Sequence, residues 1–266
     1  MKRLLIILFL LLMVPPCQDY GMAQQDSEQS PYPEVAWLNS AVMGSTSGLS
    51  GCYSFVAANT QYLYSNDQVV STDDSYTICA WFKTDSTTLF QTLYYECQYG
   101  VDSQNYLNLS LSTTSSFVDF RKRTSGASIA ALSDTSWKTA GVWQHACGVS
   151  DNVQPYRAYL NANPGADQTT DVNPSPDFMS IGASYDGLNP DGFFSGKIAH
   201  VAVWNVALTQ ENITALAVPG TLPTSISGCI AYWPLTTNLN DTVGTKHLTG
   251  GGGTGVPTLD STDGPW

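Results

Sequence analysis

The fold of this chain is decided by two stretches, GKIAHVAVWNVALTQENITALAVPG at residues 196–220 and GCIAYWPL at residues 228–235. In the first stretch, small and apolar residues alternate from Gly196 to Trp204, as they do in a strand with one buried face. A short helical segment follows, and the second stretch is again strand-like. The pattern predicts a strand, a helix and a second strand that ends in Tyr-Trp-Pro-Leu.

Strand-like runs also fill the chain upstream of this region. They are separated by clusters of Ser, Thr, Asn, Asp, Gly and Pro at a spacing of about ten residues, which is typical of a β-sandwich. The clearest run is Tyr76 to Lys83, in which alternate residues predict one buried face: Tyr76, Ile78, Ala80 and Phe82. The other runs are 90–98, 106–112, 117–123, 143–149 and 157–160. The sequence therefore predicts an all-β protein with two antiparallel sheets.

One short helix is expected, from Thr209 to Val218. Thr209 is a suitable N-cap, Glu211 favours the first turn, and Pro219-Gly220 ends the helix. The glycine run at 250–253 predicts a turn before a last edge strand. In a phosphate-binding loop the glycines are followed by a lysine and a helix. Neither follows here, so the sequence excludes such a loop.

The first 23 residues are predicted to be a signal peptide. Lys2 and Arg3 precede an apolar run over residues 4–14, and small residues before Gln24 predict cleavage after Ala23. The apolar run is shorter than the roughly 20 residues that span a membrane. The alternative is a lipoprotein signal acylated at Cys17, which the two preceding prolines disfavour.

The remaining chain is expected to be secreted, with no membrane insertion. Residues 24–49 are expected to hold a polar arm, at 24–34, and an ambiguous segment, at 35–49, that is a candidate for a first edge strand. Residues 50–266 are long enough for one large β domain. Asn108, Asn212 and Asn240 each begin a glycosylation sequon, which matters only in a eukaryotic secretory pathway.

The charge of the chain excludes some partners. Removal of residues 1–23 leaves 8 basic and 21 acidic residues, a net charge of −13. Nucleic acids and anionic membranes attract basic surfaces, so neither is an expected partner. The acidic residues make the protein soluble, and some of them are candidates to hold Ca²⁺, which prefers oxygen ligands.

Seven motifs follow one another in a characteristic order. They are Phe55 to Tyr62, Tyr76 to Lys83, Trp143 to Val149, Arg157 to Asn161, Ser180 to Gly182, Gly196 to Asn205 and Ala231 to Asp241. Together they resemble the laminin G-like (LamG) family of concanavalin A-like lectin and glucanase domains, over residues 50–263. The resemblance implies a two-sheet antiparallel jelly roll, used mostly for binding and only sometimes for catalysis.

The chain lacks acidic residues at positions that can serve a calcium site in this family. Val56 and Gln61 stand where the early strand often carries acidic residues, and His200 replaces a late acidic residue. No cofactor is therefore required. A structural calcium remains an option, with candidate ligands at Asp186, Asp191 and Asp241.

Five cysteines follow the expected cleavage site, and their spacing is not that of a metal site. Secretion favours disulfides. Because the two ends of the domain come together in the family that the chain resembles, we predict a disulfide between Cys52 and Cys229. The odd number leaves at least one thiol free or shared between chains.

Catalysis is not expected. Polysaccharide-hydrolysing jelly rolls carry an E-x-D-x-x-E strand, and a retaining glycosidase needs two carboxylates about 5 Å apart. Glu96 is the one glutamate in a predicted strand, and it has no acidic residue within five positions. No Gly-x-Ser-x-Gly motif is present, and His145, His200 and His247 are expected to be structural.

Carbohydrate binding is the leading functional hypothesis. Sugars need aromatic faces for stacking, with Asn, Asp or Gln to fix their hydroxyl groups. Two stretches supply these residue types, the loop at 184–194 and the strand-like stretch at 94–99. The predicted ligand-binding residues are Tyr94, Tyr99, Tyr185, Asp186, Asn189, Asp191 and Phe193. The alternatives are that these tyrosines only pack a sheet face, or that the protein is a structural or adhesion module on a cell or virion surface. The oligomeric state stays open.

Overall fold

A computed structural model describes residues 50–71, 74–100, 104–113, 117–137, 139–152, 156–185, 188 and 190–266. All of these belong to the unit Gly44–Trp266. The expected signal peptide at 1–23 and arm at 24–49 lie outside the described residues.

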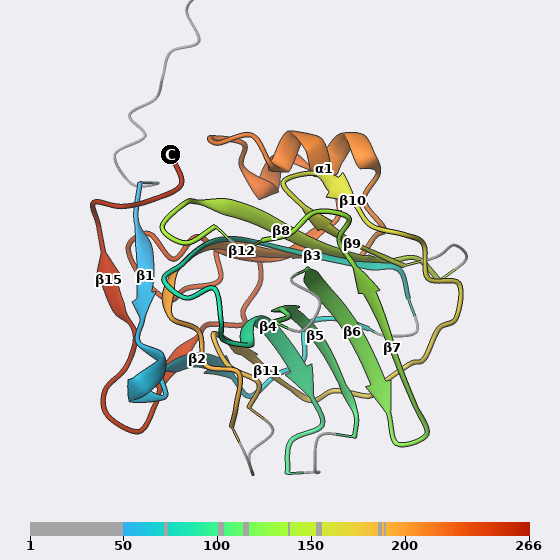
Figure 1. The fold of residues 1–266 in the computed structure, drawn as a ribbon, viewed down its shortest axis with the longest axis horizontal. Coiled ribbons are helices and arrows are strands. Elements are labelled where there is room, and N and C mark those ends of the chain that lie inside the picture. The colour runs from blue at the N-terminus through green and yellow to red at the C-terminus, as the bar shows by residue number, and fades with distance from the viewer. Residues whose placement is uncertain are drawn as a thin grey trace, which may run out of the picture. The chain divides into compact units, whose positions relative to one another are not determined.

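Two antiparallel sheets face each other and form a sandwich (Figure 1). The order of strands in sheet A is β10 (Asn163–Pro164), β9 (Arg157–Leu160), β8 (Gln144–Ser150), β3 (Tyr76–Thr84), β12 (Gly196–Trp204), β1 (Cys52–Phe55) and β15 (Thr258–Asp260), and β13 (Cys229–Trp233) also pairs with β12. The order in sheet B is β14 (Thr249–Gly251), β2 (Tyr62–Ser65), β11 (Phe178–Ile181), β4 (Gln91–Cys97), β5 (Tyr106–Leu111), β6 (Val118–Thr124) and β7 (Ala127–Leu132). The predicted jelly-roll class is confirmed.

The alternation seen in the sequence sets which side chains enter the core. Tyr76, Ile78, Ala80 and Phe82 of β3 all lie in the hydrophobic cluster between the sheets, as predicted. The intervening residues of β3 point to the outer face of sheet A, because successive side chains of a strand alternate between its two faces.

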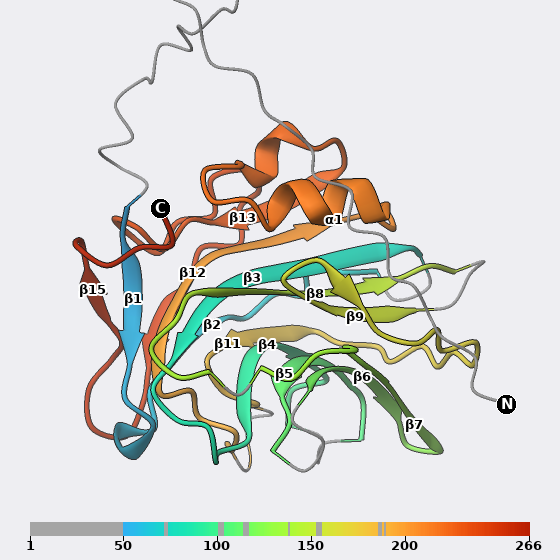
Figure 2. The same cartoon turned by 45° about the horizontal axis from the view of Figure 1, so that its top comes forward.

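The outer face of sheet A is covered by helix α1 (Gln210–Leu216), which lies above β3, β8 and β12 (Figure 2). Ile213 and Leu216 of the helix pack with Trp204 and the two cysteines of β3 and β8 in a second apolar cluster. Thr209 caps the helix as predicted, since its side chain accepts a hydrogen bond from the Asn212 N–H. Two 3₁₀ helices, η1 (Ala57–Asn59) and η2 (Pro223–Ser225), complete the helical elements of the described chain.

Residues after β15 cover another part of the same face. The indole of Trp266 stacks on the imidazole of His200, with ring centroids 3.7 Å apart. The carboxylate of Asp263 accepts hydrogen bonds from Lys83 and Lys197, which come from two adjacent strands. Sheet A is thus covered on its outer face, whereas none of the described helices covers sheet B. A membrane-spanning helix is not found among the described residues.

The predicted disulfide between Cys52 and Cys229 is wrong. Both thiols are free, and the disulfide joins Cys79 of β3 to Cys147 of β8. Those two residues are direct partners across the strands, with Cα atoms 4.1 Å apart.

The strand register explains the error. Strands β1 and β13 both pair with the edge of β12 that β3 leaves free, but at different heights. Cys52 precedes Tyr53, which is opposite Ile198, and Cys229 is opposite Trp204. Five residues of strand separate these heights by about 16 Å, well beyond the Cα separation of about 4.4–6.8 Å of a disulfide.

Candidate functional site

The outer face of sheet B carries an aromatic cluster. We call it the aromatic face, and its rings are Tyr62, Tyr64, Tyr95, Tyr99, Tyr106, Phe178 and Tyr185. Ring centroids lie 5.3 Å apart for Tyr95 and Tyr106, and 5.7 Å apart for Tyr64 and Phe178. Tyr185 joins the group from the loop after β11, with its ring 4.7 Å from that of Tyr62.

Polar side chains stand beside these rings because the register aligns them. Tyr95 of β4 pairs with Asn108 of β5, and Asn108 pairs with Arg121 of β6. Two residues earlier on β5, Tyr106 pairs with Arg123. Residues opposite each other in a sheet share a face, so these side chains lie in two adjacent rows.

A groove of about 200 Å³ opens on this face. Its lining comes from five parts of the fold: the turn before β4, the three strands β4, β5 and β6, and the loop after β11. The residues are Phe90, Tyr95, Tyr106, Asn108, Arg123, Ser184 and Asp191. The groove therefore combines aromatic rings, an amide, a guanidinium, a hydroxyl and a carboxylate.

Hydrogen bonds hold the loop side of the groove in place. Ser184 and Asp191 exchange two backbone hydrogen bonds of 3.0 Å, which close the loop between them. The loop is tied to β4 at Thr92, whose hydroxyl lies 2.8 Å from that of Ser184 and whose N–H donates to the Gly192 carbonyl. Ser184 and Asp191 are thus fixed relative to the sheet.

Asn108 has an unsatisfied acceptor in this groove. Its side chain is only 4% exposed, and its Oδ1 atom has no hydrogen-bond partner among the described residues. Buried polar atoms are nearly always hydrogen-bonded, and leaving one unpaired costs about 1–3 kcal/mol. The Asn108 amide oxygen is therefore an unused acceptor on a residue that lines the groove.

Two further hollows border the aromatic face. One, of about 430 Å³, is lined by Thr60, Tyr62, Tyr185, Leu188, Pro190, Phe193, Gly252 and Gly253. The other, of about 320 Å³, is lined by Asn66, Tyr99, Asp177 and Phe178. Tyr185 contacts a ring of each hollow: its ring centroid lies 4.7 Å from that of Tyr62 in the first and 6.1 Å from that of Tyr99 in the second.

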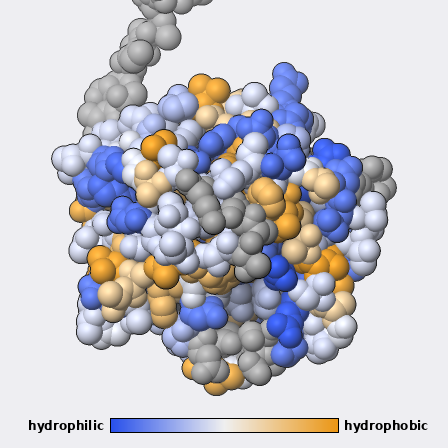
Figure 3. Space-filling model, in the orientation of Figure 1, coloured by the Kyte–Doolittle hydropathy of each residue, from blue (hydrophilic) through white to orange (hydrophobic). Residues whose placement is uncertain are grey.

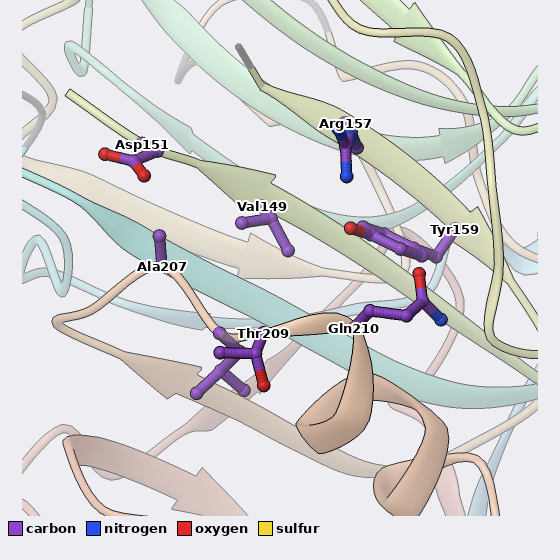
Figure 4. A pocket seen from close by; sticks show the side chains of 8 residues that line it. Val149, Asp151, Arg157, Tyr159, Ala207, Thr209 and Gln210 are labelled. Carbon is purple, nitrogen blue, oxygen red and sulfur yellow. The ribbon is translucent and has the colours of Figure 1, made fainter. Parts of the chain in front are cut away.

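A separate pocket of about 260 Å³ lies on the outer face of sheet A, beside the start of α1 (Figure 4). Figure 4 shows Arg157 and Tyr159 on one side and Thr209 and Gln210 on the other. The polar groups here bond within the protein. Arg157 pairs with Asp167, and Gln210 donates to the Ala162 carbonyl. This pocket lacks an unsatisfied buried acceptor among its lining residues, which favours the groove on sheet B as the candidate site.

Apolar residues form several separate groups on the face of the molecule shown in Figure 3, interspersed with polar ones. Four exposed apolar side chains belong to the aromatic face or the loops around it. They are Leu89, Phe90, Tyr99 and Leu188. Of these four, Phe90 lines the groove, whereas Leu188 and Tyr99 line the two neighbouring hollows.

The structure brings together four of the predicted ligand residues. Asp191 lines the groove, Tyr185 and Phe193 line the larger hollow, and Tyr99 lines the smaller one. Asp186 and Asn189 lie outside the described residues.

The placement predicted for Tyr94 is wrong. Tyr94 is fully buried in the core between the sheets, where its hydroxyl donates to Glu96. The pairing of β4 with β5 shifts register between Thr92 and Tyr94, so simple alternation from the strand start assigns the wrong face. Tyr95 takes the place on the aromatic face that was predicted for Tyr94.

Glu96 is also internal. Both of its oxygens accept hydrogen bonds from the backbone N–H groups of Val69 and Val70, in addition to that from Tyr94. Burial raises the pKa of Glu96 to about 7, and the hydrogen bonds from Tyr94 and the backbone act in the opposite direction. The one strand glutamate is therefore a structural group inside the core.

Asp241, predicted as a calcium ligand, is occupied by its own loop. Its carboxylate accepts from the N–H groups of Tyr232, Val243, Gly244 and Lys246. Three of these hydrogen bonds go to Oδ1 and one goes to Oδ2, so the carboxylate holds the turn after β13. Gln61 and His200, which stand where the family carries acidic residues, are also structural. Gln61 bridges Val56 and Val256, and His200 lies 2.6 Å from the Tyr232 hydroxyl.

The described residues contain one group of side chains close enough to share a metal ion, namely Cys79, His145 and Cys147. Its two sulfurs are joined in the disulfide, so they are not ligands in this structure. His145 is buried, and desolvation lowers its pKa to about 3, which fits the structural role predicted for it.

Several residues of the groove were missed by sequence reasoning, namely Phe90, Tyr95, Tyr106, Asn108, Arg123 and Ser184. Asn108 was noted only as a sequon. A signal did exist, because Tyr106, Asn108 and Ser110 alternate with three leucines over 106–111, as expected for one polar face. The pairing of these residues with β4 and β6 was not readable from the sequence.

A sandwich with a groove on one sheet is the arrangement of a lectin-like domain. The family model of the concanavalin A-like lectin/glucanases superfamily matches residues 57–214, and the chain belongs to this superfamily. No curated protein matches the chain.

Solved structures share the fold. A putative carbohydrate-binding protein from Bacteroides ovatus is 19% identical, with a TM-score of 0.60, and the match covers 82% of this chain and 61% of that one. A heptameric SAP-like pentraxin from Limulus polyphemus is 16% identical, with a TM-score of 0.53, and the match covers 77% of this chain and 95% of that one. At these identities the likeness concerns the fold.

Proposed function

We propose that the protein is a secreted, non-catalytic binding module that recognises carbohydrate in the groove on the aromatic face of sheet B. The observation that carries the proposal is the buried Oδ1 atom of Asn108, which has no partner among the described residues and belongs to a residue that lines the groove. A sugar hydroxyl is a donor that would satisfy it.

The rings of the groove support the same ligand. The buried ring of Tyr95 supports the half-buried ring of Tyr106 at an interplanar angle of 32°. Tyr106 and the exposed Phe90 are therefore the rings of the groove that a sugar can touch. Aromatic rings offer a rigid apolar surface to the C–H face of a sugar, while nearby polar groups fix its orientation. Ser184 and Asp191 add a hydroxyl and a carboxylate on the loop side.

A binding role also fits the carboxylates. A glycosidase needs two carboxyl groups on either side of the scissile bond. Of the residues that line the groove, Asp191 alone has a carboxylate, and Glu96 is enclosed in the core. The proposal therefore assigns the groove to recognition.

Secretion is part of the proposal. The disulfide between Cys79 and Cys147 supports it, because disulfides persist in oxidising compartments. The apolar run at 4–14 supports it from the sequence. N-terminal sequencing of the exported protein tests this directly, and a mature chain that begins at Gln24 is the expected result.

A glycan array tests the binding function, with the wild type compared with Asn108→Leu. Leucine has the same number and branching of side-chain heavy atoms as asparagine but cannot accept a hydrogen bond, so array binding should be lost. Asn163→Leu on strand β10 of sheet A is the matched control and should bind like the wild type. A blank array for the wild type, with concentration-dependent oligomers in light scattering, would favour the structural or adhesion alternative instead.

A further inference from the structure

One arginine of the described residues lacks an acidic partner. Seven lysines and arginines are described, and six of them form ion pairs with carboxylates. These six are Lys83, Arg121, Lys122, Arg157, Lys197 and Lys246. The seventh, Arg123, makes a single side-chain hydrogen bond, 3.3 Å long, to the amide oxygen of Gln104.

The exception matters because of the charge of the chain. With 22 acidic and 10 basic residues in the sequence, carboxylates are in excess. The neighbour two residues away on the same face of β6, Arg121, pairs with Asp119 at 2.6 Å. The lone cation is therefore not the result of a shortage of partners.

Arg123 lies where a ligand would meet it. It lines the groove at the β6 side, directly opposite Tyr106 in the pairing of β5 with β6. Gln104 occupies only part of its hydrogen-bonding capacity, because a guanidinium has five N–H donors. The remaining donors form a planar fork that matches a carboxylate or a sulfate better than a single hydroxyl.

Two other polar groups of the groove define the rest of the ligand that would bind at Arg123. Asn108 offers its unsatisfied acceptor one row away from Arg123, and Asp191 offers a carboxylate from the loop. A ligand that fits all three has an anionic group near Arg123 and hydroxyl or N–H donors directed at Asn108 and Asp191. An acidic sugar has this distribution of groups.

We propose that the groove selects glycans with an acidic sugar residue, whose anionic substituent is bound by Arg123. This inference rests on the proposed carbohydrate function of the same groove. It adds the class of sugar and the residue that selects it.

The experiment measures affinity for matched glycan pairs by isothermal titration calorimetry. The pairs are sialyllactose with lactose, and oligogalacturonate with its methyl ester; a sulfated oligosaccharide shows whether sulfate also serves. We expect the acidic member of at least one pair, or the sulfated glycan, to bind at least tenfold more tightly than its uncharged counterpart. That ratio is typical of one charge-assisted pair of hydrogen bonds.

Three variants assign the effect. Arg123→Gln should reduce affinity for the acidic glycan about tenfold or more, and Arg123→Lys should restore only part of it, because lysine keeps the charge but loses the fork. Arg157→Gln, which removes a paired arginine from the outer face of sheet A, should change nothing. Thermal unfolding of each variant shows that the fold is kept.

The outcomes separate this inference from the function on which it rests. Equal binding of neutral and acidic glycans that is lost in Asn108→Leu but kept in Arg123→Gln would overturn the acidic selectivity and leave the lectin function standing. Binding of no glycan by the wild type would overturn both.

Discussion

Tyr95 and Asn108 are direct partners in the antiparallel pairing of β4 with β5, and both line the groove on the aromatic face. An aromatic ring and an unsatisfied amide therefore share one site. Rigid strands hold both groups, so the geometry exists before any ligand binds. Preorganisation of this kind reduces the entropy cost of binding.

The first prediction concerns the stability of Asn108→Leu. The Oδ1 atom is buried without a partner, so its removal should not destabilise the protein and should raise its free energy of unfolding by about 1 kcal/mol. Urea unfolding of the wild type and the variant measures this. A loss of 2 kcal/mol or more would show that the amide has a structural role, contrary to our account.

The second prediction contrasts two tyrosines of neighbouring strands. Tyr106→Ala should weaken glycan binding about threefold to tenfold, the range expected for one aromatic contact. Tyr94→Phe should leave binding unchanged but reduce the free energy of unfolding by about 1 kcal/mol, because Glu96 loses a donor. Glycan binding that is unchanged in Tyr106→Ala would contradict the placement of the ligand on the aromatic face.

The sequence predicted the two-sheet fold well because alternation reports burial directly. The residues of β3 that alternate in the sequence are those found in the core. Alternation fails where a strand shifts register, and the shift near Thr92 is the reason that Tyr94 was placed on the wrong face. Local pattern does not encode such a shift.

The site was less predictable than the fold, because it depends on which strands are neighbours. The loop residues Tyr185 and Asp191 were found from their composition alone. Asn108 and Arg123 required the pairing of β5 with β4 and β6. The same limit applies to the disulfide, since Cys79 and Cys147 meet only through the register of β3 with β8.

The third prediction concerns pH. The pKa of Glu96 is raised from 4.5 to about 7, so between these values the folded protein binds more protons than the unfolded chain. Glu96 therefore contributes stability that is fully present below pH 4.5 and is lost as the pH rises through 7, by about 3 kcal/mol at most. His145 acts in the opposite sense, because its pKa is lowered to about 3 and its contribution falls as the pH drops below 6.5.

The variant Glu96→Gln separates the contribution of Glu96 from that of His145. The free energy of unfolding of the variant, relative to the wild type, should rise steadily between pH 4.5 and pH 7.5. Chemical denaturation of both proteins at three pH values in this window provides the comparison. A difference that does not change with pH would mean that Glu96 titrates normally.

The fourth prediction concerns the disulfide. Cys79 and Cys147 are separated by 68 positions in the sequence, and closing a loop of this size in the unfolded chain is worth about 4 kcal/mol in the chain-entropy model. The double variant Cys79→Ala with Cys147→Ala should lose stability of this order. Cys229→Ala should lose much less, because its thiol is free. Peptide mapping that finds Cys52 linked to Cys229 would contradict the assignment.

The fifth prediction is that glycan binding does not need calcium. Asp241 is engaged by four backbone N–H groups of its own loop, and the groove offers only Asp191 as a carboxylate. Affinity measured in calcium and again in chelator should agree within a factor of two. A loss of binding in chelator would revive a metal site that includes the loop residues Asp186 and Asp191.

The most direct test of the central claim is a glycan array of the wild type and Asn108→Leu, run side by side. We predict that the wild type binds a defined set of glycans and that the variant, still folded, binds none of them. Binding by the variant that equals that of the wild type would contradict the claim that the groove on sheet B is the carbohydrate site.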